Sequence, residues 1–152
     1  MQRIELKEFL RYQYLSGIKY APDGSRAAFV VTVANETENN YESRLWLYDG
    51  GLRQLTDLGK ERNFWWEDSE HLLFAADRSA ADRKRREAGE QFTSFYRLDL
   101  RGGEAIHAFA LPFAASRLER IPSGWAVLGS IDASYPDYFL YNSLNLRGNC
   151  MV

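Results

Sequence analysis

The sequence has a single cysteine, Cys150, among its 152 residues. One thiol cannot form a disulfide within the chain and cannot build a thiolate metal site. Histidine is also scarce: His71 and His107 are the only two, and neither stands at a metal-ligand spacing with carboxylates. No apolar run is long enough for a signal peptide or a membrane span. These absences predict a cytoplasmic protein with no metal site, no cofactor and no membrane partner.

The sequence also has no large excess of positive or negative charge. The chain has 19 Lys and Arg against 21 Asp and Glu, which gives a formal net charge of −2. No overall basic field is therefore available to hold nucleic acid or anionic lipid. Aromatic residues, in contrast, are abundant, with four Trp, nine Tyr and nine Phe. Such residues pack well on pleated surfaces, so the composition favours a folded chain rich in β-structure.

The N-terminal stretch differs from the rest of the chain. Leu6, Phe9 and Leu10 stand at positions i, i+3 and i+4, the spacing of a short amphipathic helix. We therefore expect an N-terminal helical segment over residues 1–13. From residue 14 onwards, short apolar runs alternate with turn signals, which is typical of strands.

One group of strands and turns stands out in the first third of the chain. The turn Pro22-Asp23-Gly24-Ser25 precedes an apolar strand at residues 27–33. A polar loop over residues 35–43 then leads to a strand at 45–48. Asp49-Gly50-Gly51 predicts a tight hairpin turn, and a strand over residues 52–56 returns from it.

The same order recurs twice. A second turn at residues 67–70 precedes strands at 72–76 and 95–100, the hairpin Arg101-Gly102-Gly103 and a return strand at 105–109. A third, weaker copy has a turn at 121–124 and strands at 125–131 and 138–141. The period is about 45–55 residues, as expected of propeller blades. The alternative is a two-sheet sandwich whose self-similarity is accidental.

These repeats predict an all-β fold: a partial β-propeller of about three four-stranded blades, WD40-like or TolB-like, after the short helix. The blades are expected at about residues 14–59, 60–110 and 111–152. Closed propellers need at least about four blades. Open blade faces and sheet edges invite association, so the isolated chain is expected to form an oligomer.

The residues also carry a resemblance. The stretch from Tyr20 to Phe29, followed by Leu45-Trp46-Leu47-Tyr48-Asp49, resembles the N-terminal propeller of the prolyl oligopeptidase family, especially its acylaminoacyl-peptidase-like branch. The N-terminal residues 6–16 and the segment 82–97 are similar to that branch too, so the resemblance covers about residues 4–141. It implies a propeller that caps a separate α/β-hydrolase domain and filters peptides on their way to a Ser-Asp-His triad.

A catalytic nucleophile is not predicted within this sequence. The nucleophile elbow of such hydrolases needs Gly-x-Ser-x-Gly, and neither Gly24-Ser25 nor Gly129-Ser130 supplies it. A serine with Asp68 and His71 is a poor triad, because neighbours along one strand are expected to point in alternating directions. No residue is assigned a catalytic role, and whether the chain belongs to an enzyme stays open.

Two groups of residues are candidate contact sites. The run Arg83, Lys84, Arg85 and Arg86 lies in a charged segment over residues 78–91. It fits a nucleic-acid patch, a solvated helix with ion pairs to its own Glu residues, or a contact arm onto a catalytic domain or a second protomer. Trp65 and Trp66 are candidate ligand-facing aromatics that line a funnel, or else part of the blade core.

The leading functional hypothesis is a non-catalytic propeller portion of a serine peptidase that gates or caps a hydrolase domain and encounters peptide substrates. The alternatives are a TolB-like protein-interaction propeller and a self-associating scaffold without peptidase function.

Overall fold

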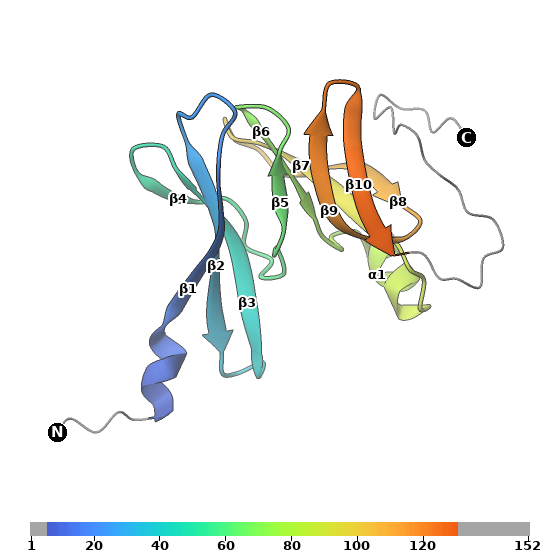
Figure 1. Cartoon of the computed structure of the whole chain (residues 1–152). Coiled ribbons are helices and arrows are strands. Elements are labelled where there is room, and N and C mark those ends of the chain that lie inside the picture. The colour runs from blue at the N-terminus through green and yellow to red at the C-terminus, as the bar shows by residue number, and fades with distance from the viewer. Residues whose placement is uncertain (1–5, 131–152) are drawn as a thin grey trace.

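The chain folds into a stack of β-sheets in the computed structural model, which describes residues 6–130. Sheet 1 is a four-stranded meander in the order β1-β2-β3-β4, and sheet 2 is a second meander in the order β5-β6-β7-β8 (Figure 1). Strands β9 and β10 form a separate antiparallel hairpin. The elements are η1 (Leu6–Arg11), β1 (Gln13–Tyr20), β2 (Ala27–Asn35), β3 (Asn40–Tyr48), β4 (Leu52–Gln54), β5 (Phe64–Trp66), β6 (His71–Ala75), α1 (Ala80–Glu87), β7 (Thr93–Asp99), β8 (Ile106–Leu111), β9 (Ala114–Ile121) and β10 (Gly124–Ser130).

The first turn of each meander has the same hydrogen bond. In sheet 1 the amide of Ser25 donates to the carboxylate of Asp23 at 2.9 Å, and in sheet 2 the amide of Glu70 donates to that of Asp68 at 2.8 Å. An Asp side chain that binds the amide two residues ahead is a common turn device. Gly24 adopts a φ of 72° in the first of these turns, a conformation that glycine takes without strain. The repeat predicted from the two turns is thus present in the structure.

Sheets 1 and 2 pack face to face and share the first hydrophobic core. The alternation along β2 and β3 sends Ala28, Val30, Leu45 and Leu47 towards sheet 2. The buried residues of sheet 2 that meet them are Phe64, Trp66, Leu72, Phe74, Tyr96 and Leu98. This arrangement buries the apolar face that neither meander can cover alone.

A second core lies on the opposite face of sheet 2. Trp65, Leu73 and Phe95 project to that side and pack against the β9–β10 hairpin. Leu111 at the end of β8 and Phe113 just after it also belong to this core, and the hairpin contributes Leu118 and Trp125. Sheet 2 is therefore buried on both faces, which explains why residues 72–74 of β6 form an uninterrupted apolar run.

Polar contacts fasten the two meanders along their edges. The Arg26 guanidinium, after the first turn, donates to the carboxylate of Glu70 in the second turn at 2.9 Å. The guanidinium of Arg53 donates to the carbonyl oxygen of Leu100 at 3.0 Å. Each contact joins positions more than 40 residues apart in the chain, so both act between the sheets rather than within one.

Several sequence expectations need correction. The helix expected within residues 1–13 is present as the 3-10 helix η1, but Phe9 and Leu10 of its expected apolar stripe are exposed. The polar loop is only residues 36–39, since the polar residues Asn40–Glu42 pair with the end of β2. The return strand β4 stops at Gln54. Of the third blade, the hairpin β9–β10 is seen, and the strand predicted at residues 138–141 lies outside the described residues.

None of the helices between residues 6 and 130 is long and apolar enough to cross a membrane.

Candidate functional site

The charged segment between β6 and β7 forms helix α1, and its own sequence sets the helix boundaries. Ser79 caps the N-terminus: its hydroxyl accepts from the amide of Asp82 at 2.9 Å, and its amide donates back to the Asp82 carboxylate at 3.4 Å. This reciprocal pair is a capping box. Gly89 follows the helix with a φ of 80°, the left-handed conformation that commonly ends helices.

Asp82 anchors this helix to sheet 2. Asp82 is only 5% exposed. Its carboxylate accepts hydrogen bonds from the hydroxyls of Tyr96 at 2.6 Å and Ser94 at 2.8 Å. Burial acts to raise the pKa of Asp82, but the hydrogen bonds from Tyr96, Ser94 and Ser79 outweigh it and hold the pKa below its usual value. The helix is therefore fixed to β7 by an ionised, buried carboxylate.

A second buried carboxylate lies where the two sheets meet. Glu61 is 0% exposed, and its Oε1 has no hydrogen-bond partner among the described residues. The nearest cation is the guanidinium of Arg78, whose Nη1 lies 3.9 Å from that oxygen. Arg78 immediately precedes the capped helix, and its guanidinium also lies over the Tyr96 ring at 5.8 Å. The ion pair of Glu61 with Arg78 thus joins the loop before β5 to the residue that precedes the N-cap of α1.

The basic run of α1 divides into paired and unpaired cations. Arg86 makes two hydrogen bonds of 3.1 Å to Asp77, and Arg85 donates to Glu90 at 2.7 Å. Both guanidinium groups also lie over the ring of Phe92, at 4.0 and 4.4 Å from its centroid. The pair of Arg85 with Glu90 is of the kind expected for a helix with ion pairs to its own Glu residues, whereas Arg86 pairs with Asp77, which precedes the charged segment.

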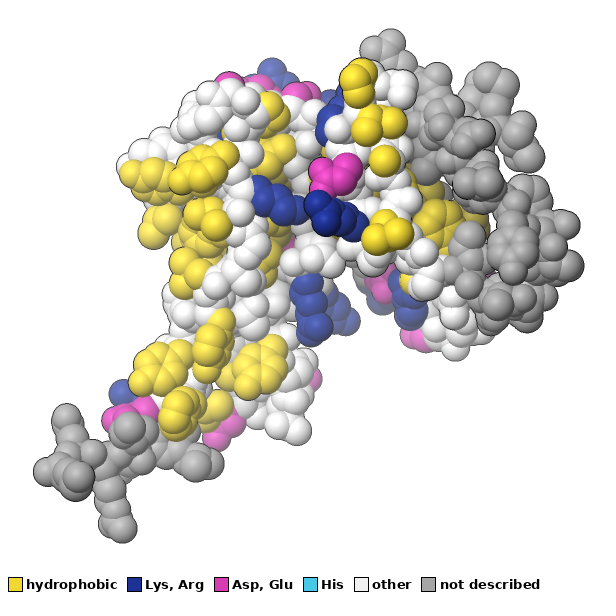
Figure 2. Space-filling view, viewed as in Figure 1, with side chains coloured by type: hydrophobic (Ala, Val, Ile, Leu, Met, Phe, Trp, Pro, Cys, Tyr) yellow, Lys and Arg dark blue, Asp and Glu magenta, His cyan; other side chains and the backbone are white. Residues whose placement is uncertain are grey.

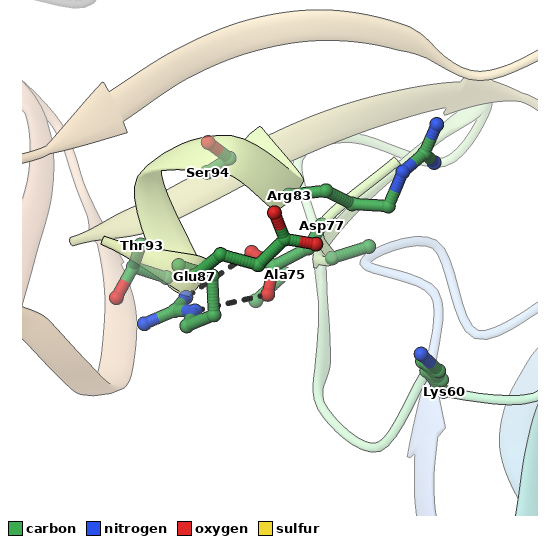
Figure 3. Close-up of a pocket in the computed structure, with 9 residues that line it drawn as sticks. Lys60, Ala75, Asp77, Arg83, Glu87, Thr93 and Ser94 are labelled. Carbon is green, nitrogen blue, oxygen red and sulfur yellow. Dashed lines mark hydrogen bonds and ion pairs between the residues drawn. The ribbon is translucent and has the colours of Figure 1, made fainter. Parts of the chain in front are cut away.

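Arg83 and Lys84 are different, because neither has a carboxylate partner within residues 6–130. Arg83 donates instead to the carbonyl oxygen of Arg78 at 3.0 Å, which leaves its charge uncompensated. A cavity of about 390 Å³ adjoins this side of the helix, with Lys60 across it from Arg83 and Glu87 (Figure 3). The remaining lining residues are Ala75, Ala76, Asp77, Arg86, Thr93 and Ser94. Among its charged lining residues, the basic Lys60, Arg83 and Arg86 outnumber the acidic Asp77 and Glu87.

Trp65 and Trp66 lie in the cores rather than on a ligand funnel. Trp65 packs in the second core with its ring at 5.9 Å from that of Phe95, edge to face. Trp66 packs in the first core, and its Nε1 donates to the carbonyl oxygen of Lys19 at 3.1 Å. Both are buried. Their placement matches the core alternative, since successive side chains of β5 point to opposite faces of sheet 2.

Asp68 and His71 lie closer together than the sequence argument allowed. His71 Nδ1 is 2.8 Å from an oxygen of Asp68, because Asp68 belongs to the turn and not to the strand. The other ring nitrogen, Nε2, faces Asp99 at 3.7 Å. Among the described residues, no serine or threonine hydroxyl is hydrogen-bonded to His71, so this pair has no nucleophile to activate. The contact ties the turn to the end of β7.

Lys19 of β1 is a further polar residue that the sequence did not indicate. Its ammonium donates to the carbonyl oxygen of Phe64 and lies 5.0 Å from the centroid of that ring. The pKa of Lys19 is lowered, chiefly by desolvation, and nearby Glu119 partly opposes the shift. Glu119 is in turn paired with Arg117 at 2.7 Å. Charged groups of β1 and β9 therefore meet next to β5.

Comparisons with known proteins agree with a peptidase propeller. The chain is 29% identical over 119 residues to the "Uncharacterized peptidase YuxL" of Bacillus subtilis, a match that covers 74% of this chain and 16% of that protein. It superposes on the β-propeller domain of the trilobed protease from Pyrococcus furiosus with a TM-score of 0.53 and 17% identity, over 74% of this chain and 32% of that one.

A second solved structure gives the same result. The acylaminoacyl peptidase of Pyrococcus horikoshii matches with a TM-score of 0.52 and 21% identity, over 74% of this chain and 16% of that one. No protein-family model matches. The chain spans less than a third of the length of the relatives it matches. The predicted fold class, a portion of a β-propeller, is confirmed, and the resemblance to the prolyl oligopeptidase propeller is consistent with these relatives.

Proposed function

We propose that this chain is the non-catalytic propeller portion of a serine peptidase that resembles acylaminoacyl peptidases. In this proposal residues 1–13 precede three blades at about 14–59, 60–110 and 111–152. The blades cap a separate α/β-hydrolase domain and restrict its access to peptides in the cytoplasm. In this arrangement the chain encloses the entrance to the active site and contacts the hydrolase domain, and the hydrolase domain contributes the catalytic triad.

The stacking of the two meanders is the observation that carries the proposal. Sheets 1 and 2 are consecutive four-stranded antiparallel units with the same first turn, packed face to face through one core. This is how propeller blades bury their faces. The sequence match to a peptidase runs through most of the same residues, and 84% of that peptidase lies outside the match, since the match covers 16% of it.

Helix α1 supplies the surface that we assign to the hydrolase domain. The unpaired cations Arg83 and Lys84 and the nearby Lys60 favour an acidic partner surface. The anchors at Asp82 and Arg78 hold the helix in one orientation. A rigid, positively charged projection of this kind suits docking better than free solvation, because its orientation is already fixed before the partner binds.

Three observations test the proposal. The reading frame that encodes this chain should also encode a Gly-x-Ser-x-Gly elbow downstream, and a frame without one would favour the TolB-like interaction propeller instead. The hydrolase domain encoded there should bind the purified chain, and the double variant R83E/K84E should weaken that binding at least about tenfold.

The control is Arg117→Glu, a single charge reversal at an exposed position on β9. Equal weakening by the control and by R83E/K84E would contradict the assignment of α1. The chain alone should show no turnover of N-acetyl-amino-acid chromogenic substrates. Turnover that a serine-directed inhibitor abolishes would contradict the non-catalytic role.

A further inference from the structure

The first strands of the three sheets lie close together (Figure 1). Strands β1, β5 and β9 each begin a sheet and, within residues 6–130, each is an edge strand of it. The ammonium of Lys19 on β1 reaches the carbonyl oxygen of Phe64 on β5, and Trp65 of β5 shares a core with Leu118 of β9. Blades surround a central channel in a closed propeller, so edge strands that meet in this way line that channel. We call β1, β5 and β9 together the first-strand wall.

Cations predominate on the first-strand wall. Its charged residues are Lys19 on β1 and Arg117, Glu119 and Arg120 on β9. Figure 2 shows basic and acidic side chains meeting at the centre of this side of the molecule, between the hydrophobic side chains of sheet 1 and those of the β9–β10 hairpin. Arg120 is engaged within the hairpin, since its guanidinium lies over the ring of Trp125 at 5.4 Å.

The one carboxylate of the wall is already paired. Glu119 lies 2.7 Å from Arg117 on the same strand, and both side chains are largely exposed, 61% and 69%. Desolvation chiefly lowers the pKa of Lys19, while Glu119 opposes the shift and Arg117 adds to it, so all three groups lie within electrostatic reach. No carboxylate in the described part of the chain forms an ion pair with Lys19. The three groups together carry one net positive charge, and the uncompensated cation is Lys19.

Strand β5 holds Lys19 in place at two points. The ammonium donates to the carbonyl oxygen of Phe64 and lies 5.0 Å from the centroid of the Phe64 ring and 5.2 Å from that of Trp65. The carbonyl oxygen of Lys19 accepts from Nε1 of Trp66 at 3.1 Å. An ammonium has three N–H donors, and the bond to Phe64 uses one of them, so two remain for a ligand. A cation fixed before binding loses less conformational freedom when the ligand arrives.

We propose that Lys19 binds a carboxylate of a peptide that passes along the first-strand wall, either at the C-terminus of the peptide or on an acidic side chain. A carboxylate can accept a charge-assisted hydrogen bond from the free donors of the ammonium. Glu119 weakens this binding, because its negative charge repels the incoming carboxylate. The inference rests on the proposed function, since the three strands line a channel only in a propeller.

An NMR titration of the full, isotope-labelled chain with N-acetyl-trialanine tests the proposal. The backbone amides around Lys19 and in β5 should shift, with a dissociation constant in the millimolar range expected of about one exposed charge contact. The C-terminal amide of the same peptide, at equal ionic strength, should bind at least about threefold more weakly, because it lacks the carboxylate. The amide of N-acetyl-Ala-Asp-Ala carries its carboxylate on a side chain instead, so its affinity distinguishes the two sources.

Variants of two residues should change the affinity for N-acetyl-trialanine in opposite directions. Lys19→Gln removes the cation and should weaken binding at least about fivefold, whereas Lys19→Arg keeps the charge and should stay within about threefold of the wild type. Glu119→Gln should strengthen binding about twofold or more, because the repulsion is lost and the guanidinium of Arg117 is released. A structural role of Lys19 alone would not account for the gain. The matched control is Lys7→Gln, which removes an exposed lysine of η1 and should leave binding unchanged.

Three results would overturn the inference: no shift with peptide at about 20 mM, equal affinity for all three peptides, or a Lys7→Gln variant as impaired as Lys19→Gln. An unchanged circular dichroism spectrum shows that a variant is folded. Should Lys19→Gln fail to fold, Glu119→Gln at its exposed position decides alone, and unchanged or weaker binding would then contradict the inference. The proposed function fails separately, because the downstream elbow and the binding of the hydrolase domain are measured without peptide.

Discussion

The hydroxyl of Tyr96 donates a 2.6 Å hydrogen bond to the carboxylate of Asp82 and so joins β7 of sheet 2 to helix α1. The same carboxylate receives the hydroxyl of Ser94 and caps the helix through Ser79. One side chain therefore decides both where the helix begins and how it is held on the sheet.

Tyr96→Phe should lower the free energy of unfolding by about 1.5–3 kcal/mol, since a buried hydrogen bond to a charged group is lost. Urea unfolding followed by circular dichroism measures the change. Tyr41→Phe is the matched control, because Tyr41 is exposed, and it should change stability by less than about 0.5 kcal/mol. Equal effects of the two variants would show that the Tyr96 hydroxyl does not stabilise the anchor.

The stability contributed by Asp82 should depend on pH. Its pKa in the folded chain is held below the usual value, so the folded state binds fewer protons than the unfolded state in the acid range. The contribution is complete above about pH 4, the pKa in the unfolded chain, and is lost as the pH falls through the lower folded pKa. The difference in unfolding free energy between the wild type and Asp82→Asn should therefore shrink below about pH 4. A difference that stays constant from pH 7 to pH 2 would contradict this.

Removal of the Arg78 guanidinium should lower the free energy of unfolding, because the buried carboxylate of Glu61 then has no nearby cation. Arg78→Leu leaves the fully buried carboxylate without its nearest cation, and a loss of about 2–4 kcal/mol is expected. The lower part of the usual range applies because the Arg78 side chain is 21% exposed. The double variant Arg78→Leu with Glu61→Leu should recover part of the loss, since no uncompensated charge remains. Additive losses in this double-mutant cycle would show that the two groups do not interact.

Gly129 should not tolerate a side chain. A Cβ at this position would lie 2.6 Å from Cδ2 of Phe113 and 2.7 Å from the carbonyl oxygen of Ala114. Gly129→Ala should push the β9–β10 hairpin away from Phe113 and cost about 1–3 kcal/mol. Gly51→Ala is the control, because a Cβ there meets no atom within 4 Å and the backbone is not in the left-handed region. Thermal unfolding of both variants distinguishes a packing effect from a general loss of glycine.

The sequence predicted the strands whose burial leaves a signal. Strands β2 and β6 carry apolar runs directly after turn residues, and both were placed within two residues of their observed ends on at least one side. Strands β1 and β9 were not predicted, because β1 is exposed throughout and β9 is mostly so, and neither shows an alternation to detect. Their pairing partners, rather than their own residues, determine that they are extended.

Only part of the candidate site can be predicted from the sequence. The four consecutive basic residues were evident, and the Ser79-x-x-Asp82 pattern was a capping signal that could have located the start of the helix. The partners of Asp82 lie 12 and 14 residues further along the chain, so no local pattern connects them. The pairing of Asp68 with His71 was missed for a related reason: a residue in a turn does not follow the alternation of the strand beside it.

The position of sheet 2 between two other layers has a consequence for how the chain unfolds. In the described part of the chain, sheet 1 and the β9–β10 hairpin each share a core with sheet 2 alone, whereas sheet 2 shares a core with both, so its amides should exchange with solvent last. Within residues 6–130, loss of sheet 2 removes the hydrophobic core that each neighbour shares with it, while loss of the hairpin leaves the first core intact. Stability in such a row is a sum over adjacent interfaces. Local unfolding should therefore begin in sheet 1 and in the β9–β10 hairpin, and the unfolding of sheet 2 should coincide with global unfolding.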